Sequence, residues 1–133
     1  MTKRPLFAPF LFFALSVGCG GGGKGPDTGT QEGASAQGAK EARALFESLC
    51  FTCHGLTGHG DGPGAVALNP KPRSFADVAW QDSVTDEQIS KTIVYGGAAV
   101  GKSPIMPAQP QLKGQTAVLD SLVKIVREFR GHK

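Results

Sequence analysis

The stretch CFTCH at positions 50–54 constrains this chain more than any other feature, because it places two thiols and an imidazole within five residues. An amphipathic segment leads directly into it, so the three side chains stand at the end of a predicted helix. The chain has only one other cysteine, Cys19. Such a cluster can bind a metal, form a disulfide or attach a cofactor. The stretch therefore predicts that the fold is built around this site.

The order Cys-x-x-Cys-His favours one chemistry, the covalent attachment of a c-type haem. Each thiol, Cys50 and Cys53, would form a thioether with one vinyl group, and His54 would be the proximal iron ligand. A redox-active cysteine pair is typical of a strand followed by a helix, a pattern that is absent from the sequence. A zinc site would need further ligands. A disulfide between the two cysteines would close a small strained ring. Haem c is thus the predicted cofactor.

The N-terminus predicts export. Basic residues at positions 3–4 precede an apolar run at 6–17, which is typical of a secretory signal and too short to span a bilayer comfortably. The stretch LSVGC resembles a bacterial lipoprotein signal, although Ser16 stands where that family prefers leucine. We therefore predict a signal peptide at residues 1–18 and lipidation of Cys19. The alternative is ordinary cleavage nearby, which would leave a free thiol.

Composition divides the rest of the chain into two parts. Residues 19–38 are rich in Gly, Ala, Ser, Thr and Gln, with almost nothing to bury, and are predicted to form a flexible tether. Residues 39–133 are predicted to form one domain on the periplasmic side of a bacterial membrane. The formal charge of the whole chain is only +3, which gives no electrostatic case for binding nucleic acid.

Three helices are predicted in this domain, giving an all-α fold. The first covers residues 39–53. The second begins after Thr85, a residue suited to a capping box, and ends at Gly96 and Gly97. The third covers residues 115–130, with one wide apolar face. Proline-rich irregular segments join them, and loops of that length in a small domain usually serve a site. Three short helices bury little on their own, so a large apolar ligand would complete the core.

Beyond the CFTCH stretch, the chain resembles class I cytochrome c over residues 39–129. The resemblance rests on ARALFESLCFTCHG, on GHGDGPGAVALNPKPRSF and on IMPA. Ala42 stands where that family usually has a glycine at a helix crossing. The resemblance implies one haem wrapped by helices and long loops, with Met106 as the sixth iron ligand. A thioether is a soft ligand that favours ferrous iron, and Met106 lies in an irregular loop with no helical face to fill.

The resemblance also implies roles for four further residues. Pro70 and Pro104 resemble prolines that shape the haem crevice. Arg73 and Trp80 are candidates to donate hydrogen bonds to the haem propionates. The alternative is that Arg73 is solvated and Trp80 is packed in the core. His59, in a glycine-rich loop, is interpreted as a surface residue.

These residues imply single-electron transfer, with redox proteins as donor and acceptor. The sequence shows no nucleophile–base pair and no phosphate loop, so neither enzymatic activity nor a small-molecule substrate is expected. The protein would be a monomer or part of a complex. One alternative is a cytochrome subunit of a larger oxidoreductase. Another is a haem sensor for small ligands, in which Met106 leaves the iron easily.

Overall fold

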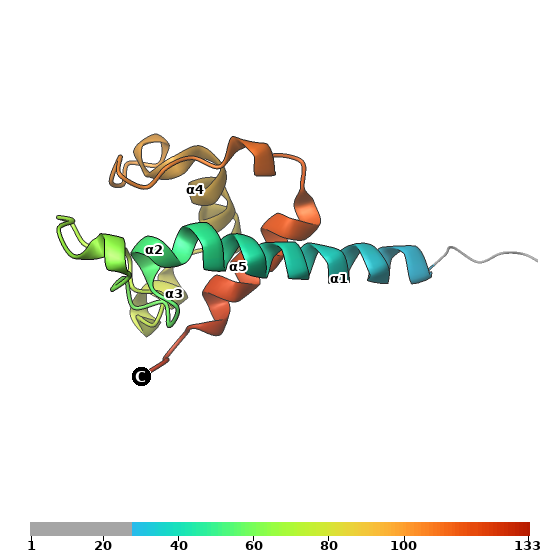
Figure 1. The fold of residues 1–133 in the computed structure, drawn as a ribbon, viewed down its shortest axis with the longest axis horizontal. Coiled ribbons are helices and arrows are strands. Elements are labelled where there is room, and N and C mark those ends of the chain that lie inside the picture. Colours follow the sequence, from blue (N-terminus) through green and yellow to red (C-terminus); the bar gives the residue numbers. More distant parts are fainter. Residues whose placement is uncertain (1–27) are drawn as a thin grey trace, which may run out of the picture.

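The computed structural model describes residues 28–133, and every regular element in that range is a helix (Figure 1). The all-α prediction is confirmed. The signal peptide and Cys19 lie outside the described residues. The elements are, in order, α1 (Thr28–Leu45), η1 (Phe46–Cys50), α2 (Phe51–His54), η2 (Pro63–Ala65), α3 (Val78–Ser83), α4 (Asp86–Ala99), η3 (Pro110–Leu112) and α5 (Thr116–Glu128). Of these, η1 is a π-helical segment, and η2 and η3 are short 3-10 helices.

Helices α1, η1 and α2 form one continuous rod, seen as the long horizontal helix in Figure 1. Its end agrees with the predicted first helix, but its start at Thr28 lies well before residue 39. The prediction of a flexible tether at 19–38 therefore does not hold for residues 28–38, which are helical. Tertiary contact accounts only for the end of this stretch, because Gly33 and residues 35–37 are exposed. A Cβ added to Gly38 would lie 2.8 Å from the carbonyl carbon of Ala117, so α1 packs tightly on α5 at Gly38.

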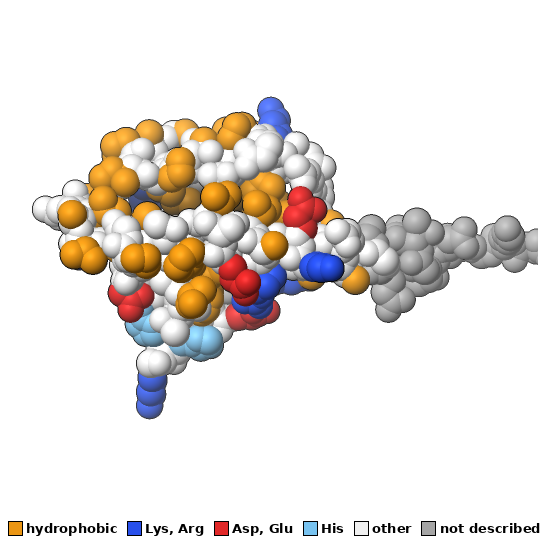
Figure 2. Space-filling view, viewed as in Figure 1, with side chains coloured by type: hydrophobic (Ala, Val, Ile, Leu, Met, Phe, Trp, Pro, Cys, Tyr) orange, Lys and Arg blue, Asp and Glu red, His pale blue; other side chains and the backbone are white. Residues whose placement is uncertain are grey.

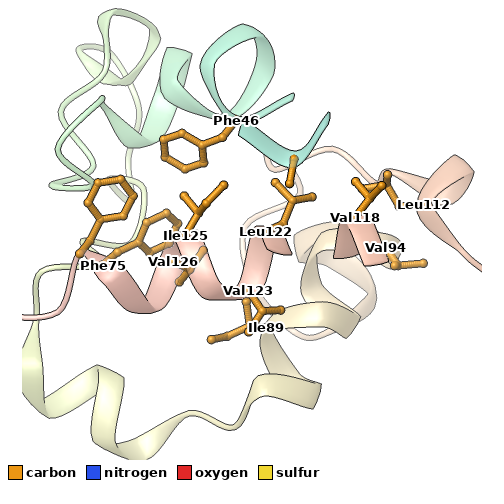
Figure 3. Close-up of a cluster of buried hydrophobic side chains, with 12 residues drawn as sticks. Phe46, Phe75, Ile89, Val94, Leu112, Val118, Leu122, Val123, Ile125 and Val126 are labelled. Atoms are coloured by element: carbon orange, nitrogen blue, oxygen red, sulfur yellow. The ribbon is translucent and has the colours of Figure 1, made fainter. Parts of the chain in front are cut away.

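The rod crosses α5 through a stripe of residues spaced four apart: Gly38, Ala42 and Phe46. The rings of Phe46 and Phe129 pack with centroids 5.4 Å apart. Ala42 is fully buried, so the small residue expected at this crossing is present one turn after Gly38. Figure 3 shows the core that gathers around this crossing, and its members are Ala42, Phe46, Phe75, Ile89, Val94, Leu112, Val118, Leu122, Val123, Ile125, Val126 and Phe129.

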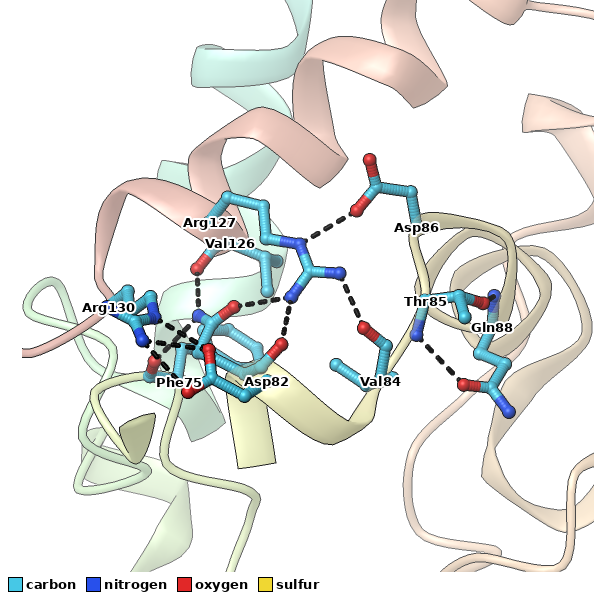
Figure 4. Close-up of polar contacts among 10 residues, drawn as sticks. Phe75, Asp82, Val84, Thr85, Asp86, Gln88, Val126, Arg127 and Arg130 are labelled. Carbon is cyan, nitrogen blue, oxygen red and sulfur yellow. Dashed lines mark hydrogen bonds and ion pairs between the residues drawn. The ribbon is translucent and has the colours of Figure 1, made fainter. Parts of the chain in front are cut away.

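Helix α4 begins as the sequence predicts. The Thr85 hydroxyl accepts a hydrogen bond from the Gln88 backbone N–H at 3.2 Å, and the Gln88 side chain accepts one from the Thr85 N–H at 2.9 Å (Figure 4). This reciprocal pair is the predicted capping box. At the other end Gly96 has a φ of 78°, which interrupts the helix where the sequence predicted its end.

Helix α5 agrees with the predicted third helix to within two residues at each end and buries its predicted apolar face. Helix α3 was not predicted, because six residues are too few to show a helical period. Its start did carry a signal, since the side chain of Asp77 caps it by accepting a hydrogen bond from the Trp80 N–H at 3.1 Å. Within the described range, none of the helices is long and apolar enough to cross a membrane.

Candidate functional site

The two thiols and the imidazole stand at the far end of the rod. Cys50 closes η1, and Cys53 and His54 lie in α2. Both thiols are free and partly buried, so they form no disulfide with each other. Burial, and to a lesser degree the neighbouring Cys53, raises the pKa of the Cys50 thiol to about 11, which keeps it protonated at neutral pH. Among residues 28–133, no three His, Cys, Asp or Glu side chains converge as ligands of one metal ion, as a zinc site would require.

The imidazole of His54 can bind a metal through its Nε2 atom. Its Nδ1 lies 3.2 Å from the carbonyl oxygen of Arg73. A carbonyl can only accept, so Nδ1 carries the hydrogen and Nε2 keeps its lone pair. Burial lowers the pKa of His54, while the hydrogen bond to Arg73 acts in the opposite direction. The residue is thus a neutral imidazole whose free nitrogen is the ligand atom that metals use.

Glycines after His54 donate backbone hydrogen bonds to the C-terminal end of α2. The N–H groups of Gly55, Gly60 and Gly62 donate to the carbonyls of Phe51 (2.8 Å), His54 (2.8 Å) and Cys53 (3.2 Å) respectively. These are carbonyls that a helix leaves without partners at its C-terminus. A side chain at Gly62 would collide with the carbonyl oxygens of Phe51 and Thr52, so the loop returns too close to the helix for any other residue.

Further along the chain, Phe75 packs against His54. Phe75 donates its N–H to the carbonyl of Gly58 at 2.6 Å, and its ring stacks on the imidazole with centroids 4.4 Å apart. It also neighbours Phe129, at 6.2 Å between centroids. Sequence reasoning missed Phe75. The only available signal was an aromatic residue just after the proline-rich stretch.

Arg73 and Trp80, both predicted to face the propionates, lie together. The guanidinium carbon of Arg73 is 5.8 Å from the centroid of the Trp80 ring, and Arg73 pairs with Asp77 at 3.5 Å. The Trp80 ring is partly buried and packs against Phe75, with centroids 5.7 Å apart. Both residues thus lie next to groups that contact His54, since the Arg73 carbonyl is bonded to Nδ1 and Trp80 packs on Phe75.

Met106 and Pro104 belong to the loop after α4, which folds back on the helix break. Gly97 donates its N–H to the carbonyl of Met106 at 3.0 Å. A Cβ on Gly96 would lie 3.1 Å from that same carbonyl oxygen, so glycine lets the two segments approach. Met106 is partly buried and Pro104 is exposed. In Figure 1 this loop and the end of α2 lie at the same end of the molecule, away from the start of α1.

The loop between η2 and α3 contains Pro70, which is exposed and follows Asn69 through a cis peptide bond. The neighbouring Lys71 donates to the carbonyls of Ala65 and Val66, both at 2.8 Å, so its ammonium group holds η2 in place. His59 lies close to the Thr57 hydroxyl, with 3.1 Å between its Nδ1 and that oxygen.

Large apolar side chains are exposed around this end of the molecule. Leu49 and Leu56 flank the cysteines in sequence, and Tyr95 and Ile105 flank the glycine break and Met106; their exposed fractions lie between 48% and 65%. Figure 2 shows hydrophobic side chains on both α1–α2 and the layer above them at this end. Exposed apolar side chains gathered at one end of a domain are typical of a binding site. Two free thiols, an available imidazole nitrogen and an apolar surround are the groups that a covalently attached haem requires.

In a comparison with protein-family models, the cytochrome c model matches residues 39–119. No curated protein and no solved structure matches the chain. The match covers more than half of the chain, from the middle of α1 into α5. Members of the family bind haem c covalently, and Cys50, Cys53 and His54 fit their attachment motif. The all-α fold and this motif agree with the match, and the chain belongs to the cytochrome c family.

Proposed function

We propose that this protein is a single-electron carrier whose iron is held by His54 and Met106. A haem with two protein ligands supplies a reversible ferrous–ferric couple. The residues around it need only fix both ligands and exclude water, so that little rearranges when an electron moves. The observation that carries the proposal is the state of His54, which is neutral, bonded through Nδ1 to a backbone carbonyl and free at Nε2.

The loop at Met106 supports a role as the second ligand. Two hydrogen bonds hold the backbone of Met106. Its carbonyl accepts from the Gly97 N–H, and its N–H donates to the carbonyl of Ser103 at 3.3 Å. A thioether on a loop held in this way can be presented to a metal at a defined place. Pro70 and Pro104 would border the same crevice, and Arg73 with Trp80 would donate to the propionates.

We further propose that the protein is exported and lipidated at Cys19, on the periplasmic side of a bacterial membrane. The basic and apolar N-terminus and the stretch LSVGC support this. An anchored domain would exchange electrons with redox proteins near the membrane surface. Replacing Cys19 with serine should move the protein from the membrane fraction to the soluble fraction. A protein that stays soluble in its wild-type form would contradict the anchor.

The visible spectrum of the reduced protein, with and without carbon monoxide, tests the proposed ligands. A low-spin c-type spectrum that carbon monoxide leaves unchanged would support ligation by both His54 and Met106. A spectrum that shifts with the gas would favour the alternative of a ligand sensor. Met106→Ala provides the matched comparison, because it should open the sixth position and make the spectrum sensitive to carbon monoxide.

Co-purification distinguishes a free shuttle from a subunit of a larger oxidoreductase. A shuttle should elute from a sizing column as a small protein after mild detergent extraction from its own cells. Stable elution with a catalytic partner would favour the subunit reading instead.

A further inference from the structure

The segment between η2 and α3 makes two contacts with His54. The Arg73 carbonyl accepts from its Nδ1–H, and the Phe75 ring stacks on its face. The position of this segment therefore controls how well the imidazole hydrogen bond is aligned. The question is what holds the segment in place.

Gln81 holds it from within the core. This glutamine is 3% exposed, the only buried polar or charged side chain among the described residues. Its Nε2 donates to the carbonyl of Phe75 and to that of Val126, both at 2.8 Å. The Phe75 residue is thus bonded on both sides, by Gly58 at its N–H and by Gln81 at its carbonyl. One amide links the segment beside His54 to helix α5.

Arg127 fixes the orientation of that amide. Its Nη1 donates to the side-chain oxygen of Gln81 at 2.8 Å and to the Gln81 carbonyl at 2.7 Å. Its other nitrogens donate to the carbonyl of Val84 (2.6 Å) and to Asp86 (2.7 Å), as Figure 4 shows. Since Arg127 can only donate, the Gln81 oxygen must face it, and the Gln81 nitrogen must face Phe75 and Val126.

We propose that Gln81 and Arg127 are positioning residues that set the strength of the His54–Arg73 hydrogen bond and, through it, the reduction potential. This inference rests on the proposed ligation by His54. A hydrogen bond from Nδ1 to a carbonyl makes the other nitrogen a stronger donor to iron. A stronger donor stabilises the ferric form. Loosening the segment weakens that bond, so the reduction potential rises.

Two variants of the holoprotein test this. Gln81→Met keeps the length of the side chain and removes both donated hydrogen bonds. Arg127→Lys keeps the charge but cannot form the forked contacts with Gln81 and Val84; it is the milder change, should Gln81→Met fail to fold. The control is Arg130→Gln, which removes the contacts of Arg130 with Asp82 at 2.8 and 2.9 Å and leaves Gln81 untouched.

Both variants should shift the reduction potential to a more positive value, and the control should not. The exchange of the His54 Nδ1–H with solvent, followed by NMR, should become faster by about tenfold, the loss expected for one hydrogen bond. If the variants lose stability while the potential and the exchange rate stay those of the wild type, Gln81 and Arg127 serve only the fold and the inference is wrong.

The same NMR spectra separate this inference from the proposed function. Ring resonances of His54 in the wild-type oxidised protein must show the large shifts expected for an iron ligand. If they do not, the proposed ligation fails regardless of the variants. If they do and the variants leave the potential unchanged, only the positioning role fails.

Discussion

Two regions of this small domain are held together in different ways. Where the rod crosses α5, side chains pack: Gly38, Ala42 and Phe46 meet a buried face of α5. In the loop of residues 55–77, Phe75 is the one member of the core cluster, and glycine N–H groups bonded to the carbonyls of α2 bring the loop close to that helix. The stability of the crossing depends on the volume of its buried apolar side chains. The structure of the loop depends on how closely its backbone can approach the neighbouring helices. The comparison teaches that the scaffold and the site respond to different kinds of substitution.

The largest effect is expected at the crossing. Phe46→Ala should lower the free energy of unfolding by about 3–5 kcal/mol, since it removes a buried ring that packs on Phe129. Chemical denaturation of the holoprotein measures this. The comparison variant is Val66→Ala in the loop, which is 79% exposed and should cost less than about 0.5 kcal/mol. Equal losses in the two variants would mean that the regions do not differ as described.

The loop should be most sensitive where a glycine approaches another element. Gly58 has a φ of +73°, and a Cβ there would lie 2.6 Å from the Phe129 ring. Gly58→Ala combines backbone strain with overlap and should cost about 2–4 kcal/mol. Gly101→Ala is the matched control, because its φ of +69° is similar but a Cβ meets nothing within 4 Å. That variant should cost only about 1–2 kcal/mol, and thermal unfolding distinguishes the two.

Helix α4 is an intermediate case, because a local hydrogen-bonded cap specifies its start. Thr85→Ala removes one half of the capping box and should cost about 0.5–2 kcal/mol. Thr85→Ser keeps the hydroxyl and should retain most of the stability. Urea denaturation of both variants measures the difference. A serine variant as unstable as the alanine variant would show that the threonine methyl group, and not the cap, matters.

The smallest effect is expected for the ion pair that joins α1 to α5. Arg43 and Glu128 lie 3.1 Å apart, with side chains 49% and 60% exposed. Solvent screening limits such a pair to about 0–1 kcal/mol. A double-mutant cycle with Arg43→Gln and Glu128→Gln measures the coupling, which should decrease further at high salt. A coupling energy above that range would mean that the ion pair, as well as side-chain packing, stabilises the helix crossing.

Local signals made much of this fold predictable, and contacts between distant segments explain what was missed. The capping box at Thr85 and the apolar face of α5 each consist of residues close together in the sequence, so both helices were predicted. The start of α1 was missed because residues 28–38 have the composition of an unstructured segment. The packing of Gly38 on Ala117 explains only the last of these residues, since a Cβ on Gly33 would meet nothing within 4 Å.

The site shows the same division. The attachment residues follow from one short motif. The acceptor for His54 is a backbone carbonyl at Arg73, which carries no mark in the sequence, and the Gln81–Arg127 contacts join residues far apart in the chain. Such partners become visible only when the chain is folded.

The π-helical segment η1 has a consequence for insertions and deletions. The Phe51 N–H bonds to the carbonyl of Phe46, five residues back, so this turn holds one residue more than an α-helical turn. Deleting one residue from η1 could restore an ordinary helix without breaking the rod. Because the extra residue lies within this one turn, α2 would keep its orientation relative to the crossing. Each residue of an α-helix accounts for about 100° of rotation, so a deletion between Ala42 and Phe46, in the regular part of the rod, would instead turn the thiols and the imidazole toward a different side of the molecule.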